Sequence, residues 1–203
     1  MKRTAARLTV WLAAGLVALP AFAATWEADP ETLIRTMTRE VIDAARADRE
    51  VAAGGPAALR VAEQKIFPLV DFEEAARLAT GRAWSQASAA QRQRLTAEFR
   101  SLLIRTVGAS QRYEGQDVRV LPVRMQSGDT DVTIHNQYVR PGAPALRLDY
   151  QMRKTPEGWK IYDIVVEGVS LVLAYRSEFD QVVRDQGIDG LIRRLAEKNA
   201  RGA

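Results

Sequence analysis

The chain of 203 residues has no cysteine and a single histidine, His135. Without cysteine, neither disulfide bonds nor thiolate metal sites can support this protein, so its stability must come from packing. One imidazole supplies too few ligands for an ordinary zinc site. The sequence also lacks a Walker loop, a dinucleotide fingerprint and a zinc motif. We therefore expect a protein that is not an enzyme and that has no metal, no cofactor and no catalytic residues.

The chain has little excess charge once its first residues are set aside. It contains 29 Lys and Arg against 25 Asp and Glu, and three of the basic residues, Lys2, Arg3 and Arg7, fall within residues 1–23. Residues 24–203 therefore carry a net charge of about +1. Arginines and acids are interspersed along the expected helices, which is typical of a solvated surface and not of a phosphate-binding stripe. We expect no nucleic-acid partner.

The only long uncharged run lies at the N-terminus. Leu8 to Leu19 follow the basic residues and precede Pro20 and the stretch Ala21-Phe22-Ala23. This order of regions is that of a secretory signal peptide, and the run is short for a bilayer span. No cysteine stands near the cleavage site to take a lipid anchor. We predict a signal peptide over residues 1–23, a single domain over residues 24–203, and export as a soluble protein to a bacterial periplasm.

The first half of the remaining chain has the period of amphipathic helices. Asp29-Pro30-Glu31 supplies a cap, a first-turn proline and an acid, and an apolar stripe that ends at Ile42 follows. Gly and Pro residues then separate further helices. These are expected from about Pro56 to Ile66, from Asp71 to near Gly81, and from Ser88 as far as Tyr113.

From Val118 onward the apolar residues recur with period two. Turn residues separate runs around Val118–Val120, Val132–Tyr138, Leu146–Met152 and Trp159–Val166. Four strands joined by short loops predict an antiparallel meander with one apolar face and one wet face.

The segment from Gly158 to Phe179 joins two apolar surfaces through the turn Glu167-Gly168. We expect a helix directly after this turn, from Val169, that is apolar nearly all round over its first two turns and so needs cover on more than one side. A last helix is expected around Ile188–Leu195. Together these patterns predict an α+β fold, in which a four-stranded antiparallel sheet is covered on one face by about six helices and encloses a hydrophobic pocket.

The polar side chains of the expected sheet are poor candidates for catalysis. His135 shares the phase of Thr133 and Gln137, so we expect it on the wet face with no acidic neighbour in phase. Asp149 has the same wet phase and is expected to form ordinary cross-strand ion pairs. Neither residue has the partners that a catalytic triad requires.

Asp163 and Ser170 are the two remaining polar residues for which a catalytic role is conceivable. The strand Trp159–Val166 is apolar in both phases, so Asp163 faces water in one assignment and the core in the other. A buried Asp163 is the arrangement that a proton-abstracting isomerase would use. Ser170 lacks the Gly-x-Ser-x-Gly elbow and is expected to cap backbone donors.

What remains is an excess of apolar side chains facing the expected interior. Each of them alone is explained by core packing. As a set, they are able to line an elongated cavity for an apolar ligand. In this arrangement sheet residues such as Tyr150 and Met152 lie opposite helices that are apolar on two sides.

Several segments carry a more specific pattern. In the C-terminal half these are Leu146–Tyr150, Gly158–Asp163, Val165–Val172 followed by Tyr175-Arg176, and Gln186–Ile192. Upstream they are Pro68–Phe72, Gly81 with Trp84, and the stretch from Gln91 to Phe99. In these segments the chain resembles the MlaC family of periplasmic phospholipid carriers, also called toluene-tolerance proteins, which help to maintain outer-membrane lipid asymmetry.

The resemblance implies an NTF2-like fold that holds phospholipid acyl chains as cargo while the head group stays near water. It implies two partners that exchange the lipid, an inner-membrane MCE-domain/ABC transporter complex and an outer-membrane lipoprotein–porin complex. Arg147 and Arg176 lie where a cation could meet the lipid phosphate, although solvated surface explains both. The resemblance and the periodicity together give the lipid-binding candidates Leu102, Leu103, Val107, Ile134, Leu148, Tyr150, Met152, Ile164, Val166, Val169, Leu171, Val172 and Tyr175.

Two other functions stay open from the sequence alone. One is a small-molecule isomerase or hydrolase of the same fold, which requires Asp163 or His135 inside the pocket. The other is a periplasmic chaperone or adaptor that covers hydrophobic protein segments.

Overall fold

The computed structural model describes residues 29–108, 113–140 and 142–201, so the predicted signal peptide and its boundary lie outside the described residues. The described α-helices are α1 (Pro30–Ala47), α2 (Arg49–Ala52), α3 (Gly55–Lys65), α4 (Phe72–Thr80), α5 (Arg82–Gln86), α6 (Ala89–Gly108) and α7 (Arg176–Arg201). Two 3₁₀ helices are η1 (Phe67–Leu69) and η2 (Leu173–Tyr175). The strands are β1 (Asp117–Val120), β2 (Asp131–Val139), β3 (Leu146–Thr155), β4 (Gly158–Val166) and β5 (Val169–Ser170).

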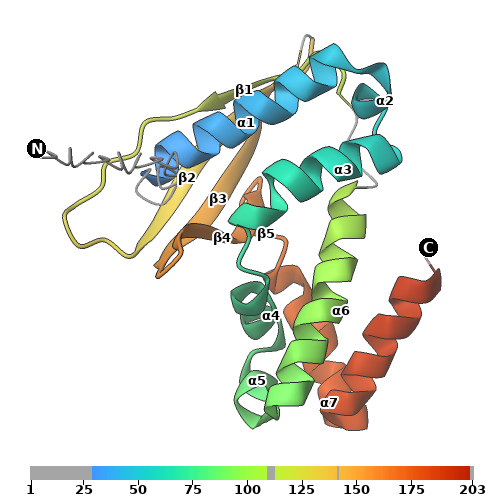
Figure 1. Ribbon diagram of the computed structural model, residues 1–203. Coiled ribbons are helices and arrows are strands. Elements are labelled where there is room, and N and C mark those ends of the chain that lie inside the picture. The colour runs from blue at the N-terminus through green and yellow to red at the C-terminus, as the bar shows by residue number, and fades with distance from the viewer. Residues whose placement is uncertain (1–28, 109–112, 141, 202–203) are drawn as a thin grey trace, which may run out of the picture.

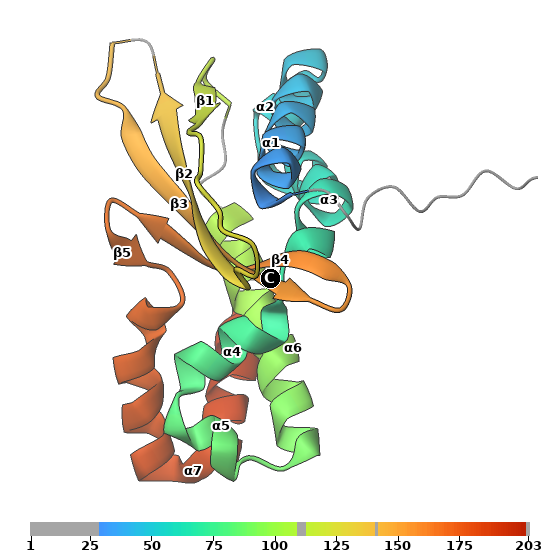
Figure 2. The same ribbon diagram turned by 90° about the vertical axis from the view of Figure 1, so that its left-hand side faces the viewer.

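The elements form two halves (Figures 1 and 2). The sheet and α1 to α3 make up one half, with these helices on one side of the sheet. Helices α4, α5 and α7 make up the other half, and α6 extends from it toward α3. None of the helices within the described ranges is both long and apolar enough to cross a membrane.

The predicted helix starts are confirmed by their caps. The Asp29 carboxylate accepts a hydrogen bond from the backbone N–H of Thr32 at 3.0 Å, with Pro30 in the first turn. Asp71 caps α4 in the same way through the N–H of Glu74 at 2.9 Å. Ser88 and Gln91 form a reciprocal capping box at the start of α6.

The sheet is an antiparallel meander in the order β1-β2-β3-β4-β5, as predicted except for the short fifth strand. A β-bulge lies in β4, because Met152 is opposite Ile161 whereas Gln151 is opposite Asp163. The extra residue is Tyr162. Ile161 and Ile164 therefore share one face although they are three residues apart, since they lie opposite Met152 and Tyr150. The bulge explains why both phases of this strand looked apolar in the sequence.

The expectation of a helix directly after Gly168 is wrong. Val169 and Ser170 pair with Val166 and Val165 as β5, and α7 begins only at Arg176. The backbone N–H of Leu171 donates to the carbonyl of Ile164 at 2.9 Å, which keeps the segment extended against β4. Gly187, at φ +70° and ψ −179°, interrupts α7, so the last helical segment is separate as expected.

Two groups of buried side chains stabilise the two halves. The sheet cluster joins the inner face of the sheet to α1 and contains Ile34, Met37, Val120, Ile134, Tyr150, Met152, Trp159 and Ile161. The helical cluster joins α4 to α7 and includes Ala75, Ala79, Trp84, Leu95, Phe99, Leu102, Val172, Phe179, Leu191 and Leu195. The helices therefore do not all cover the sheet, because α4 to α7 bury most of their apolar surface against one another.

Candidate functional site

An apolar cavity of about 160 Å³ lies where the sheet cluster meets the helical cluster. Ala75 and Val172 of the helical cluster and Ile161 of the sheet cluster all contribute to its wall. The rest of the wall comes from α1, α2, α3, η1, α6, β1, β2 and β4, and it is mostly aliphatic and aromatic. Apolar walls with few polar groups are the usual lining of small-molecule sites.

Helices α1 and α3 present one apolar stripe each to this cavity. Val41, Ile42 and Ala45 stand at helical spacing on α1, and Ala58, Leu59 and Ala62 do so on α3. Ala57 is the only fully buried residue of α3. The inner side of α3 therefore borders space and not a packed core, which fits an element that closes a cavity.

The polar lining residues at one end of the cavity are Tyr113, Gln116 and Tyr138. Tyr138 of β2 lies opposite Val118 of β1. Glu114, next to Tyr113, forms an ion pair of 3.5 Å with Arg140, so the residues that precede β1 lie beside the end of β2. The Tyr113 hydroxyl accepts a hydrogen bond from Arg46 Nε at 2.9 Å. Burial raises the pKa of the Tyr138 hydroxyl.

Asp163 also belongs to the cavity wall and is 3 % exposed. Its carboxylate accepts hydrogen bonds from the backbone N–H groups of Ile164 (2.7 Å) and Val172 (3.1 Å) and from the Ser170 hydroxyl. Burial raises its pKa, although these three donors favour the ionised form. Each donor belongs to β4 or to the segment after it, so the carboxylate fastens that segment to the strand.

The neighbouring lining residue Tyr162 is hydrogen-bonded to a residue outside the cavity wall. Its hydroxyl donates to Asp131 Oδ1 at 3.0 Å, and burial followed by this carboxylate raises the pKa of Tyr162 to about 12.

His135 has an acidic partner, which corrects the expectation from the sequence. It lies directly opposite Asp149 on the adjacent strand, and its Nδ1 is 3.0 Å from Asp149 Oδ1. Arg147 pairs with the same carboxylate at 2.7 Å, so the predicted ion pairing of Asp149 is confirmed. Although burial opposes it, the hydrogen bonds from Arg147 and His135 hold the pKa of Asp149 below its usual value.

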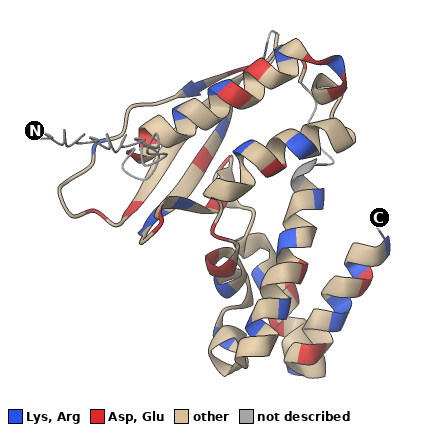
Figure 3. Ribbon diagram, viewed as in Figure 1, with Lys and Arg blue, Asp and Glu red and all other residues tan. Residues whose placement is uncertain are grey.

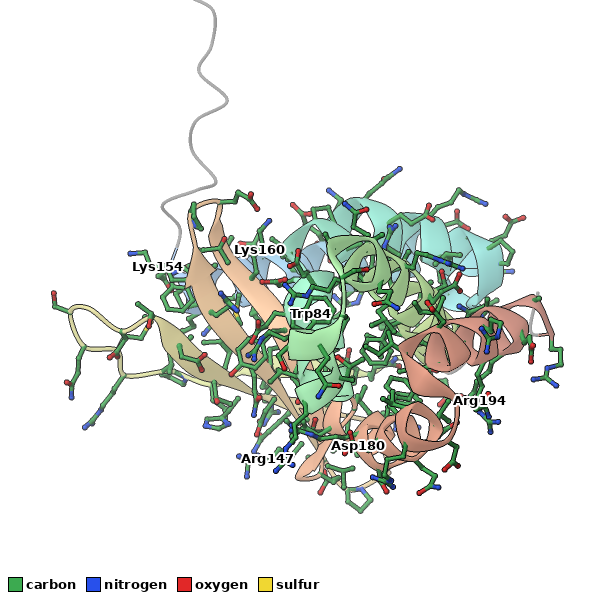
Figure 4. All side chains as sticks on the ribbon, turned by 90° about the horizontal axis from the view of Figure 1, so that it is seen from below. Trp84, Arg147, Lys154, Lys160, Asp180 and Arg194 are labelled. Atoms are coloured by element: carbon green, nitrogen blue, oxygen red, sulfur yellow. The ribbon has the colours of Figure 1, made fainter. Side chains whose placement is uncertain are left out.

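This charged group is remote from the cavity. Neither Arg147 nor His135 lines it, and Arg147 projects at the margin of the molecule (Figure 4). The guanidinium of Arg176 packs at Gly81, where a Cβ atom would lie 2.7 Å from it, and is not part of the wall either. The described residues contain no group of three His, Asp or Glu side chains placed to hold a metal ion.

The cavity brings together four of the predicted lipid-binding residues, Leu103, Ile164, Leu171 and Val172. Five others pack in or against the sheet or helical clusters without lining it: Leu102, Ile134, Leu148, Tyr150 and Met152. Tyr175 stacks on Phe179, and Val169 is 61 % exposed because β5 is an edge strand. Val166 is half-buried outside the wall, and the side chain of Val107 lies outside the described residues.

Sequence reasoning missed the contribution of α1 and α3. The signal was present, because the apolar stripe of α1 includes Val41 and Ile42. A stripe on a helix predicts burial, but it does not tell whether the buried face meets side chains or empty space.

The fold and the cavity define a small α+β protein with an apolar site between an antiparallel sheet and the surrounding helices. Comparison with known proteins is more specific: the MlaC protein family matches residues 35–197. The chain belongs to the MlaC family.

Two relatives illustrate this membership. The intermembrane phospholipid transport system binding protein MlaC of Haemophilus influenzae is 25% identical over 195 residues, which cover 94% of this chain and 90% of that protein. A phospholipid-binding protein from Ralstonia solanacearum, solved in complex with a phospholipid, has 35% sequence identity and a TM-score of 0.77, over 86% of this chain and 99% of that one.

Proposed function

We propose that this protein is a periplasmic carrier that binds the acyl chains of a phospholipid and moves the lipid between membranes. The single observation that carries the proposal is the apolar cavity at the junction of the sheet and the helices. The phospholipid in the Ralstonia relative and the transport role in the name of the Haemophilus relative support it.

The energetics of lipid transfer explain why such a carrier is needed. Two acyl chains of roughly thirty methylenes cost about 24 kcal/mol to expose to water, at ~0.8 kcal/mol each. Unassisted passage through an aqueous compartment is therefore negligible. Since a bilayer buries the same chains equally well, the cavity only has to match that environment, and the direction of transfer must come from partners.

The size of the cavity adds a requirement. A volume of about 160 Å³ is close to that of an engineered protein cavity of ~150 Å³ that accepts one benzene molecule. Two acyl chains are far larger, so loading requires the walls to separate. The wall formed by α2 and α3 has little packing to lose if it moves, because α2 has no buried residue and α3 has only Ala57.

The partners in the proposal are an inner-membrane MCE-domain/ABC transporter complex and an outer-membrane lipoprotein–porin complex. Membership of a family with an intermembrane transport relative supports them. The order of charged and apolar residues over residues 1–23 supports export to the periplasm. Along the helices and strands of the described ranges, Lys and Arg positions alternate with Asp and Glu positions and form no continuous basic stripe of the kind that a nucleic-acid partner requires (Figure 3).

The proposal includes no catalytic step. Asp163 is in the wall, as the isomerase or hydrolase alternative requires, but its carboxylate already accepts three hydrogen bonds that fasten β5 and η2. His135 lies outside the wall with a side chain that is 44% exposed. No observation favours the alternative over binding.

The test is the identity of what copurifies with the protein. Extraction with organic solvent followed by mass spectrometry should yield phospholipid in about equimolar amount. Folded protein that is free of lipid, and that stays so after incubation with phospholipid vesicles, would contradict the proposal. Peptide in the extract would instead support a chaperone or adaptor.

A further inference from the structure

The wall of the cavity contains a hydroxyl group that has no hydrogen-bond partner among the described residues. Tyr138 lines the cavity from the inner face of β2, and its hydroxyl forms no hydrogen bond with any other residue in the described ranges. The Tyr138 hydroxyl is not fully buried in the protein alone, so it carries no desolvation cost there. An acyl chain in the cavity would exclude water from this hydroxyl, which would then cost about 1–3 kcal/mol unless the ligand accepts its hydrogen bond.

The neighbouring hydroxyls of the wall differ from Tyr138. Tyr162 donates to Asp131 Oδ1, so its proton is already used. The Tyr113 hydroxyl accepts from Arg46 Nε, which leaves the proton of Tyr113 free to donate. Tyr113 and Tyr138 are therefore two phenolic donors in the wall. The Glu114–Arg140 ion pair brings their two segments together, and the Tyr113 hydroxyl lies at the exposed Arg46.

Apart from Gln116, Tyr162 and Asp163, which have hydrogen bonds within the protein, the rest of the wall is apolar. A ligand that fits the whole site therefore has a hydrocarbon part and, next to it, hydrogen-bond acceptors for the two phenolic donors. The ester linkage of an acyl chain has this composition, because its carbonyl is a strong acceptor directly attached to hydrocarbon. A diacyl lipid has two such carbonyls. Free hydrocarbon or an ether-linked chain offers the same apolar volume without the carbonyl.

We propose that Tyr138 recognises the ester carbonyl of a bound acyl lipid by donating a hydrogen bond to it, with Tyr113 beside it as a second donor. This inference rests on the proposed function and deepens it, because it makes the ligand an acyl ester and fixes its orientation. The ester region lies at the end of the cavity next to Tyr113 and Arg46, and the chains extend toward Phe67, Phe72 and Val172.

The experiment is a competition between two lipids that differ only at the linkage. Lipid-free protein is incubated with vesicles containing equal amounts of a diester phospholipid and its diether analogue, with identical chains and head group. Mass spectrometry then gives the ratio of the two lipids bound. One hydrogen bond corresponds to a preference of about fivefold for the diester in the wild type.

Two variants test the role of the hydroxyl. Tyr138→Phe keeps the ring, and we expect it to bring the ratio close to one. The matched control Tyr162→Phe removes a hydroxyl of the same wall that is already bonded to Asp131, and it should keep the wild-type ratio.

The outcomes separate this inference from the proposed function. A wild-type ratio near one, or a Tyr138→Phe ratio equal to that of the wild type, overturns the inference while the protein still binds lipid. Equal loss of both lipids in Tyr138→Phe also overturns it, because the residue then acts by packing. Uptake of neither lipid by the wild type contradicts the proposed function itself. The wild-type ratio stands as a test even where a variant fails to fold.

Discussion

The Asp163 carboxylate accepts a hydrogen bond from the backbone N–H of Val172 at 3.1 Å, and both residues belong to the wall of the apolar cavity. The same carboxylate holds Ser170, whose oxygen in turn accepts from the N–H of Leu173 at 2.8 Å. One buried side chain thus determines the path of the chain from β4 to η2. It also places Leu171 and Val172 at the cavity.

Replacement of Asp163 by alanine should destabilise the protein. Three donors would be left without their acceptor in a buried site, at a cost of about 1–3 kcal/mol for each donor that water cannot reach. Asp163→Asn keeps an acceptor oxygen for the two backbone N–H groups and is expected to lose much less. Urea unfolding of the two variants measures the difference, and equal losses would show that the hydrogen bonds do not stabilise the segment.

The pH dependence of stability should depend on Asp163. Its pKa in the folded protein is raised above the ordinary 3.8 by burial. The folded state therefore binds more protons than the unfolded state between these two pKa values, and stability falls as the pH rises through that window. Asp163→Asn lacks this contribution. The stability of Asp163→Asn relative to the wild type should increase from pH 4 upward, and a relative decrease would mean that the donors lower the pKa below 3.8.

A charge on the cavity side of α3 should block lipid binding. Leu59→Glu places a carboxylate in the wall, where contact with an acyl chain would desolvate it, and we expect lipid loading to fall at least about tenfold, or ~1.4 kcal/mol. Leu59 is preferable to Val172 as a test, because Val172 is 3 % exposed and a charge there would damage the helical cluster. The matched control is Leu173→Glu, at a leucine that is 44% exposed and outside the wall. Equal loading by both variants would separate this cavity from the lipid site.

Much of the fold was predictable from local signals, and the part that was not depends on long-range contacts. Asp29, Asp71 and Ser88 cap the helices whose starts the sequence placed at these residues. The helix expected at Val169 failed for a tertiary reason. The apolar residues after Gly168 have helical spacing, but their backbone pairs with β4 and the N–H of Val172 donates to the buried Asp163. These tertiary contacts outweigh the local helix propensity. The bulge at Tyr162 was hidden in the same way, since a strand that is apolar in both phases does not reveal where its register shifts.

The candidate site was predictable in kind but not residue by residue. Leu103, Ile164, Leu171 and Val172 line the cavity, and their roles as lipid contacts stay a prediction. Leu102 is buried within the helical cluster, whereas Leu103 packs against that cluster and also lines the cavity. One position along a helix changes the direction of a side chain by about 100°. Periodicity identifies the buried side of α6, but the position of the empty space within that side depends on α3 and β4.

Filling the cavity should separate its role in binding from its role in stability. Ala62 lines the wall on α3, and Ala62→Phe would project a ring into the apolar space of about 160 Å³. If the walls accept the ring without strain, its burial adds apolar contacts and removes none. We then expect the variant to be as stable as the wild type or up to about 1 kcal/mol more stable. Because the ring occupies volume that the acyl chains need, lipid loading should fall sharply.

Thermal unfolding and quantification of bound lipid measure the two effects on the same samples, with the exposed Ala53→Phe as the matched control. A variant that is destabilised and unloaded would indicate overpacking, whereas a stable Ala62→Phe that loads lipid normally would place the acyl chains elsewhere in the molecule.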